Sequence, residues 1–340
     1  MKVCFCNFSL VIFNKIIDTM KTIKCIFICI IFLSFGCVKN AQQSQQEKES
    51  LPIHKGEIKI KGAYALMPLV QRWINEYQKT HPSVLFNLSP VGTGEVIPEI
   101  FSDKTDLVLV SSELPDKLET TAWILPVAKL SVVMVINKRN PYWSQILESG
   151  IKKDDLARLF TGEITSWGNL FGESGKHPVS VYYRSDQAGA TNILSRYLWL
   201  DDQKMIGTGI IGENLLIEAI KADSLAIGYC NFIYSFDPES KEFLDDIKII
   251  PLDLNQNGRL DMKENFYENF TVLQRAMWLG KYPCILNRPL QIVASQKPST
   301  KELYDFLKWV ITDGQKLVAE MGYMELRSSE LQRCLSYIEN

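Results

Sequence analysis

The first folded stretch of the chain spaces its apolar residues first as a strand does and then as a helix does. The letters GEIKIK at 56–61 alternate apolar and polar residues, and 65–77 carries apolar residues at helical spacing. A second strand is expected at 84–88, a short helix at 95–101 and a third strand at 106–110. This β-α-β-α-β order predicts an open α/β sheet.

The same alternation continues to the C-terminus. Further strands are expected at 130–136, 179–183, from 226, at 247–252 and at 290–294. Helices are expected at 153–160, 190–198, 215–222 and 266–279, with one long amphipathic helix over 301–321. Two α/β units follow, with ligands expected where loops meet helix N-termini at the carboxyl ends of strands.

Size and charge exclude some classes of protein. The 340 residues leave room for two lobes, each with its own core. The composition is 46% hydrophobic and 22% charged with a net charge of −2, which is ordinary for a soluble domain. Because there is no basic block, no nucleic-acid partner is expected.

The N-terminus predicts export. From Met20 the letters MKTIKCIFICIIFLSFGC give a short basic region and then an apolar run too short to span a membrane. The end of this run, 33–37, resembles a bacterial lipobox, in which Cys37 is lipidated. Residues 1–37 therefore form the signal region, and 1–19 precede a second possible start. The alternative is a plain signal peptide with an incidental cysteine.

The next segment and the cysteines agree with export. Residues 38–56 are polar and lack apolar periodicity, which predicts a flexible tether. Cys230, Cys284 and Cys334 remain beyond the signal, without metal-ligand spacing, and are expected to be buried or incidental. A single disulfide among them stays open.

The segment DLNQNGRLDMKE at 253–264 has the spacing of a calcium-binding EF-hand loop. Gly258 stands at its sixth position, where such a loop turns sharply. The predicted ligands are the side-chain oxygens of Asp253, Asn255, Asn257, Asp261 and Glu264 and the carbonyl of Arg259. We expect a structural calcium ion here; the alternative is a solvated Asn-Gly turn.

Three expected strand-to-helix junctions share small or hydroxyl residues, at 61–68, 91–94 and 183–191. Free backbone N–H groups at a helix start attract anions. Arg184 is the cationic side chain that the sequence places among these loops, and Asp186 is near enough to orient it. Taken singly, a junction of this kind is more often a simple helix cap than an anion-binding site.

Several segments together resemble one family. They are GAYALMPLVQRW, VGTGEVIPEI, DLVLVSSEL, LFTGEITSW, YRSDQAGAT and WVITDGQKLVAEMGY. Their order and content are similar to those of the periplasmic phosphate-binding proteins, the substrate-capturing subunits of ABC transporters, from about residue 57 to the end. A branch common in Bacteroides-like bacteria is similar also in having an EF-hand-like loop and a GKYP turn in these places.

The resemblance implies an α/β, two-lobed type II periplasmic binding protein, each lobe a mixed sheet flanked by helices. Lobe one would be 57–127 with 284–340, and lobe two 128–283 including the calcium loop. The expected function is an exported, lipid-anchored, monomeric receptor of the periplasm or cell envelope. It would bind an oxyanion between the lobes and deliver it to an inner-membrane ABC permease. Inorganic phosphate is the oxyanion expected.

The resemblance also implies the anion-binding residues. They are Ala65, Leu66, Thr93, Ser111, Arg184, Ser185, Asp186, Gly189, Ala190 and Thr191. The chain departs from the family pattern at Ala63, Ala65, Ala188 and Ala190, where hydroxyl residues are usual. The identity of the anion therefore stays open.

The sequence bears on two other functions. An enzyme is not expected, because His54, His81 and His177 lie far apart and no paired catalytic motif occurs. The missing hydroxyls motivate an alternative, a calcium-stabilised surface or signalling lipoprotein of the same fold that binds another small anion or none.

Overall fold

The computed structural model describes residues 57–102, 104–186, 188–200 and 205–340. The expected signal region, Cys37 and the tether lie outside the described residues. Within the described part of the chain, no helix is both long and apolar enough to cross a membrane.

The described strands and helices follow the alternation expected from the sequence. The strands are β1 (Glu57–Ala63), β2 (Leu85–Val91), β3 (Leu107–Val110), β4 (Trp123–Asn137), β5 (Ile151–Lys152), β6 (Ser180–Arg184), β7 (Thr208–Ile210), β8 (Ala226–Asn231), β9 (Ile247–Ile249), β10 (Leu252–Asp253) and β11 (Asn287–Ala294). The helices are α2 (Met67–Tyr77), α3 (Thr93–Val96), α4 (Asp116–Thr121), α5 (Trp143–Ser149), α6 (Lys153–Phe160), α7 (Gly189–Leu198), α8 (Glu213–Ala222), α9 (Phe270–Leu279), α10 (Lys301–Ile311), α11 (Lys316–Glu320) and α12 (Ser328–Glu339).

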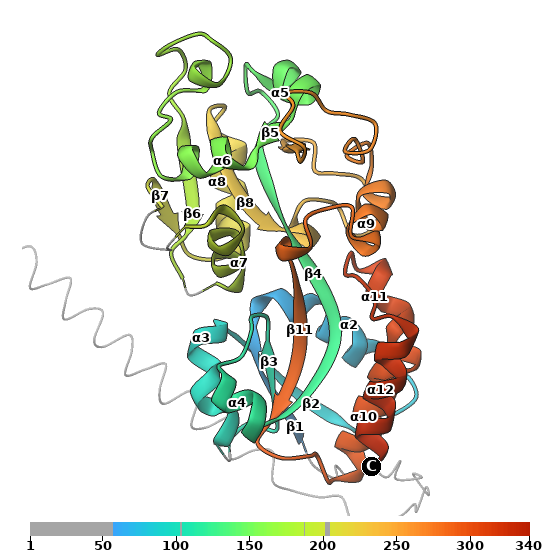
Figure 1. Cartoon of the computed structure of the whole chain (residues 1–340). Coiled ribbons are helices and arrows are strands. Elements are labelled where there is room, and N and C mark those ends of the chain that lie inside the picture. Colours follow the sequence, from blue (N-terminus) through green and yellow to red (C-terminus); the bar gives the residue numbers. More distant parts are fainter. Residues whose placement is uncertain (1–56, 103, 187, 201–204) are drawn as a thin grey trace, which may run out of the picture. The chain divides into compact units, whose positions relative to one another are not determined.

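Nine of these strands form one mixed sheet in the order β2-β1-β3-β11-β4-β8-β6-β7, with β9 also paired to β4 (Figure 1). The long strand β4 joins the two ends of the sheet. Its residues 123–131 pair antiparallel with β11, and residues 132–137 pair antiparallel with β8 and β9. The predicted mixed α/β class is confirmed, whereas the predicted lobe boundaries stay a prediction.

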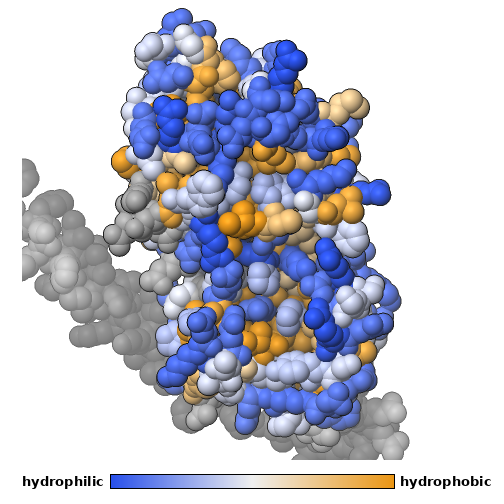
Figure 2. All heavy atoms as spheres, viewed as in Figure 1, coloured by the Kyte–Doolittle hydropathy of each residue, from blue (hydrophilic) through white to orange (hydrophobic). Residues whose placement is uncertain are grey.

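Burial in the core explains why strands such as β3 consist of consecutive apolar residues. All four residues of β3 are buried, as expected for a strand covered on both faces. On α2, Trp73 and Tyr77 point into the core, and the Tyr77 ring meets Phe306 of α10 edge-on at 5.2 Å between ring centroids. The hydrophobic residues visible in the view of Figure 2 reach the surface in small groups rather than in one broad patch.

The prediction of a single helix over 301–321 is wrong. α10 ends before Thr312, whose φ of −106° and ψ of −93° are not helical, and a 3-10 turn at Asp313–Gln315 separates it from α11. The indole N–H of Trp73 donates to the carbonyl of Gly314 at 2.7 Å. A contact 241 residues away in sequence therefore stabilises the break, and local periodicity could not indicate it.

One glycine sets how closely the strand ends approach. Gly62 has a φ of +139°, and a Cβ built on it would lie 2.3 Å from the carbonyl oxygen of Leu109. Only glycine allows both this backbone conformation and this contact. The loops that follow β1 and β3 are thereby held side by side, and both of them reach the site described next.

Candidate functional site

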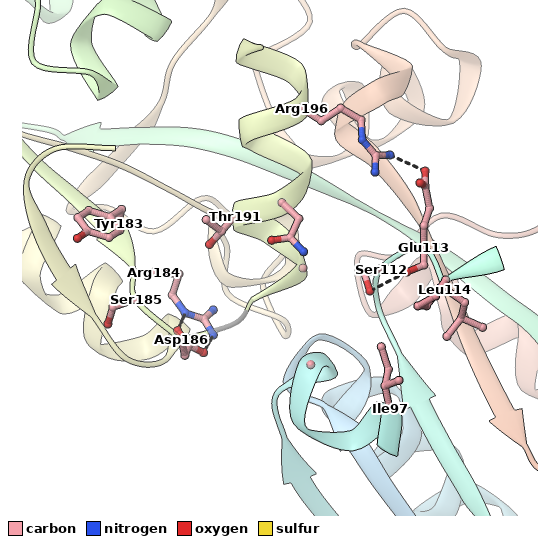
Figure 3. A pocket seen from close by; sticks show the side chains of 14 residues that line it. Ile97, Ser112, Glu113, Leu114, Tyr183, Arg184, Ser185, Asp186, Thr191 and Arg196 are labelled. Carbon is pink, nitrogen blue, oxygen red and sulfur yellow. Dashed lines mark hydrogen bonds and ion pairs between the residues drawn. The ribbon is translucent and has the colours of Figure 1, made fainter. Parts of the chain in front are cut away.

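The loops after β1, β3 and β6 meet at two adjoining cavities. The inner cavity has a volume of ≈ 20 Å³, room for about one water molecule. The outer one is an open cleft of ≈ 960 Å³ (Figure 3). Arg184, Asp186 and Gly189 line both cavities, which therefore adjoin.

Most of the predicted anion-site residues are brought together here. The inner cavity is lined by Ala65, Ser111, Arg184, Asp186, Gly189 and Ala190, and the outer cleft also by Ser185 and Thr191. Leu66 lines neither cavity, because it is fully buried in the hydrophobic core. The side chain of Thr93 lies outside what the structure describes.

Arg184 ends β6 and is almost fully buried. Its Nε donates to Asp186 Oδ1 at 2.6 Å, its Nη2 forms a short contact with Asp186 Oδ2, and its Nη1 forms one with Glu213 Oε2. Burial disfavours the charge, but these two carboxylates outweigh burial and raise the pKa of Arg184 above its ordinary value. Arg184 is therefore a charged group that the protein itself already neutralises.

The two carboxylates have opposite pKa shifts. Burial works against the charge of Asp186, yet hydrogen bonds and attraction from Arg184 prevail and hold its pKa below the usual value. Glu213 begins α8 and accepts a short hydrogen bond from the backbone N–H of Asn231. Because it is more deeply buried, burial dominates and raises the pKa of Glu213.

Arg288, like Glu213, is a charged residue of the site that no sequence pattern indicated. It lies on β11, is 1% exposed and lines the inner cavity beside Arg184. Its Nη2 donates to Asn231 Oδ1 at 2.5 Å, whereas its Nε and Nη1 have no hydrogen-bond partner among the described residues. Burial lowers the pKa of Arg288 to about 10, so the guanidinium is still charged at neutral pH. Arg184 is thus not the only cation at the site.

The start of α7 fits tightly between this arginine and the end of β3. A Cβ on Gly189, the first residue of α7, would lie 2.5 Å from the Ser111 carbonyl oxygen and 3.1 Å from Arg288 Nη1. No side chain caps this ten-residue helix. Its positive end and the unpaired Nη1 of Arg288 therefore lie close together beside the small cavity, an arrangement that favours a bound anion.

Threonine 191, also on α7, has a different partner. Its hydroxyl hydrogen bonds to the Tyr229 hydroxyl at 2.7 Å, and Tyr229 in turn accepts a hydrogen bond from the backbone N–H of Arg184 at 3.0 Å. Thr191 therefore positions β6 and α7 relative to each other as well as lining the outer cleft.

The predicted calcium loop and the late cysteines belong to other parts of the molecule. No residue of 253–264 lines either cavity. Cys230 and Cys334 are buried and Cys284 is exposed, and among the described residues all three are free thiols. The disulfide left open by the sequence is thus not formed in this structure.

The fold is an α/β protein built on one mixed sheet, whose loops meet at a small cavity lined by two arginines, Arg184 and Arg288. Residues 40–313 match the family described as PBP superfamily domain, and the chain belongs to this family.

Individual relatives agree with this assignment. The chain is 21% identical over 280 residues to the phosphate-binding protein PstS of Staphylococcus haemolyticus, covering 79% of this chain and 81% of that protein. It is 23% identical over 354 residues to PstS of Methanocaldococcus jannaschii, covering 86% and 87%.

Solved structures show the same fold. A substrate-binding protein from Clostridium perfringens with bound phosphate superposes with a TM-score of 0.65 at 16% identity, covering 80% of this chain and 100% of that one. An ABC-type phosphate transport receptor from Vibrio cholerae gives a TM-score of 0.58 at 16% identity, covering 79% and 100%. The predicted family and type II periplasmic binding-protein fold are confirmed, and the relatives are binding proteins, as predicted, rather than enzymes.

The pKa of Asp186 leads to a test of the site's electrostatics. A carboxyl with a depressed pKa contributes stability above its unfolded-state pKa, near 3.8, and loses it as the pH falls through the folded-state pKa. Asp186→Asn should lower the free energy of unfolding by about 1.5–3 kcal/mol at pH 7. The difference from wild type should shrink as the pH is lowered from 4 toward 3, as measured by chemical denaturation.

The matched control is Asp155→Asn, which removes a partly exposed carboxylate that pairs with Arg158 at 3.2 Å. Exposed pairs contribute about 0–1 kcal/mol, so this change should have a small effect at every pH. Equal effects of the two substitutions at pH 7 would contradict the description of Asp186 as a partner of the buried Arg184.

Proposed function

We propose that this chain is an exported receptor that binds inorganic phosphate, or an oxyanion of similar size and charge, at the inner cavity. It would pass the anion to an inner-membrane ABC permease. The names of the relatives support this proposal, because PstS of S. haemolyticus is a phosphate-binding protein and the V. cholerae protein is an ABC-type phosphate transport receptor.

The observation that carries the proposal is the pair of unpaired donors on Arg288. A buried donor without a partner costs about 1–3 kcal/mol, and more if it is charged. Phosphate has several acceptor oxygens, and one of them could accept a charge-assisted hydrogen bond from Nη1 of Arg288. The positive end of α7 adds to the attraction. An oxyanion would therefore satisfy groups that the described protein residues leave unsatisfied.

The carboxylates at the site influence which anion binds. Arg184 is already matched by Asp186 and Glu213, so the positive charge available to a ligand comes mainly from Arg288. Glu213 lines the inner cavity as well. A carboxylate repels a fully deprotonated anion but accepts a hydrogen bond from the hydroxyl of hydrogen phosphate. Sulfate has no such proton at neutral pH and is expected to bind less well.

The size of the inner cavity predicts a rearrangement on binding. A volume of ≈ 20 Å³ holds about one water molecule, which is less than phosphate requires. The anion would approach through the outer cleft, and the loops after β3 and β6 would adjust around it. Binding of this kind excludes water only where protein donors replace the lost hydration.

Calorimetric titration of the wild-type protein with phosphate tests the proposal, with sulfate and small carboxylates as competitors. Arg288→Gln should weaken phosphate binding by about 2–5 kcal/mol, because a buried charged donor is lost. The control is Arg196→Gln, which removes a half-exposed arginine of the outer cleft that pairs with Glu113. This control should change the affinity by about 1 kcal/mol or less.

Wild-type affinity in the Arg288→Gln protein would place the anion elsewhere. If the wild-type protein bound none of these anions, the alternative would be favoured, a calcium-stabilised surface or signalling lipoprotein of the same fold.

The lipid anchor is a separate part of the proposal. It rests on the lipobox-like segment LSFGC that ends at Cys37. In a bacterial host, Cys37→Ala should move the protein from the membrane fraction to the soluble fraction, with the phosphate affinity unchanged. A membrane fraction that stays the same in Cys37→Ala would show that no lipid at this cysteine holds the protein.

A further inference from the structure

The loop 253–264 contains two buried carboxylates without a charge partner. Asp253 is 2% exposed and Glu264 is 5% exposed. Asp186 and Glu213 pair with Arg184, but neither Asp253 nor Glu264 has an ion-pair partner among the described residues. A buried charge is costly unless it is paired or binds a metal. A cation bound in the loop would balance these two buried carboxylates.

One oxygen atom of Glu264 indicates where a cation would bind. Glu264 Oε1 accepts a hydrogen bond from the backbone N–H of Asn255 at 2.8 Å, so the carboxylate reaches across the loop to its beginning. Glu264 Oε2 is buried and has no hydrogen-bond partner among the described residues. This orphaned acceptor lies in the closed loop, on the side chain at its twelfth position.

The other oxygen-bearing side chains gather around the same loop. Asp253 accepts hydrogen bonds from the backbone N–H groups of Asn257 at 3.2 Å and Gly258 at 2.7 Å, which turns the chain around its carboxylate. Asp261 Oδ2 accepts from the side-chain amides of Asn255 and Asn257 at 2.8 and 2.9 Å. Rotating either amide by half a turn would exchange its nitrogen for its oxygen.

We propose that this loop binds one calcium ion, with Asp253, Asn255, Asn257, Asp261 and Glu264 as side-chain ligands. Its donors are oxygen atoms only, and the loop contains no His or Cys that would suit zinc. Calcium accepts six to eight oxygen ligands in a flexible geometry, whereas magnesium needs a near-ideal octahedron. Gly258 has a φ of +78°, the left-handed conformation that this sharp turn requires.

The site forms on binding. Among the described residues, no group of three or more His, Cys, Asp and Glu side chains already stands close enough to hold an ion. Only three of the proposed ligands are acidic, and Asp261 is held by the two asparagine amides. Turning these amides would free Asp261 and direct their oxygens toward an ion bound at Glu264 Oε2.

The surroundings indicate that the ion holds segments together rather than moving a helix. The loop begins in β10, which pairs with β5, and the backbone N–H of Leu260 donates to the carbonyl of Glu148 on α5 at 2.9 Å. α9 begins only at Phe270, so no helix continues directly from the loop as in a calcium sensor. Calcium would therefore fix the loop against β5 and α5 and leave the anion pocket unchanged.

Thermal unfolding of the full chain without any added anion tests this, in calcium, in magnesium and in chelator. Calcium at about a hundred times its dissociation constant should raise the Tm of the wild type by about 5 °C, and magnesium should do much less. Glu264→Gln should abolish the calcium shift. In chelator, Glu264→Gln should unfold at the same temperature as the wild type or higher, because a buried unpaired charge is gone.

Glu268→Gln is the matched control, since it makes the same change at an exposed carboxylate four residues further on and should keep the full calcium shift. Asp261→Asn, at an exposed position of the loop, gives a second variant should Glu264→Gln fail to fold. Equilibrium dialysis should find one calcium ion per wild-type chain. No bound calcium, an equal shift with magnesium, or a full calcium shift in both loop variants would overturn the proposal. Phosphate binding is measured separately, so either proposal can fail without the other.

Discussion

Two arginines and two carboxylates lie around one small cavity; Arg184, Arg288 and Glu213 are buried, and Asp186 is partly exposed. Asp186 and Glu213 neutralise Arg184. Arg288 instead hydrogen bonds to the neutral side chain of Asn231, and two of its nitrogens lack partners among the described residues. Because unsatisfied buried donors are unfavourable, we propose that an anion accepting from Arg288 would stabilise this arrangement.

The fold brings these four residues together from distant segments of the chain. Arg184 ends β6, Glu213 begins α8, and Arg288 stands on β11, which pairs along one half of β4 while β8 pairs along the other. Gly189 lets the start of α7 lie against Ser111 and Arg288. The same long strand β4 thus connects the part of the sheet that carries Arg288 with the part that carries Arg184.

How much of this could be predicted depends on whether the cause was local. The strands and helices around β1, β6 and α7 were predictable, because their apolar period and their small-residue junctions lie in one short stretch each. The pairing of Arg184 with Asp186 was predictable for the same reason. The break between α10 and α11 was not, since its cause is the Trp73 indole bonding to Gly314.

Arg288 and Glu213 were not predicted because no local pattern marks them. Each is one charged residue beside an apolar run, NRPLQIVA for Arg288 and ENLLIEAI for Glu213. Such a residue normally faces solvent at the end of an element. Only the antiparallel pairing of β11 with β4 and the packing of α8 reveal that both are buried at one cavity. A charged residue at the border of an apolar strand or helix is the available sequence signal for such a buried charge, and it is a weak one.

The central claim is that an oxyanion binds beside Arg288 at the start of α7, and a crystal structure with arsenate tests it most directly. Arsenate has the shape and charge of phosphate, and its arsenic atom can be located by anomalous scattering. We expect one arsenic peak in the inner cavity, with arsenate oxygens within hydrogen-bonding distance of Arg288 Nε or Nη1 and of the backbone N–H groups at the start of α7. An empty inner cavity with an arsenic peak elsewhere, or no peak at saturating arsenate, would contradict it.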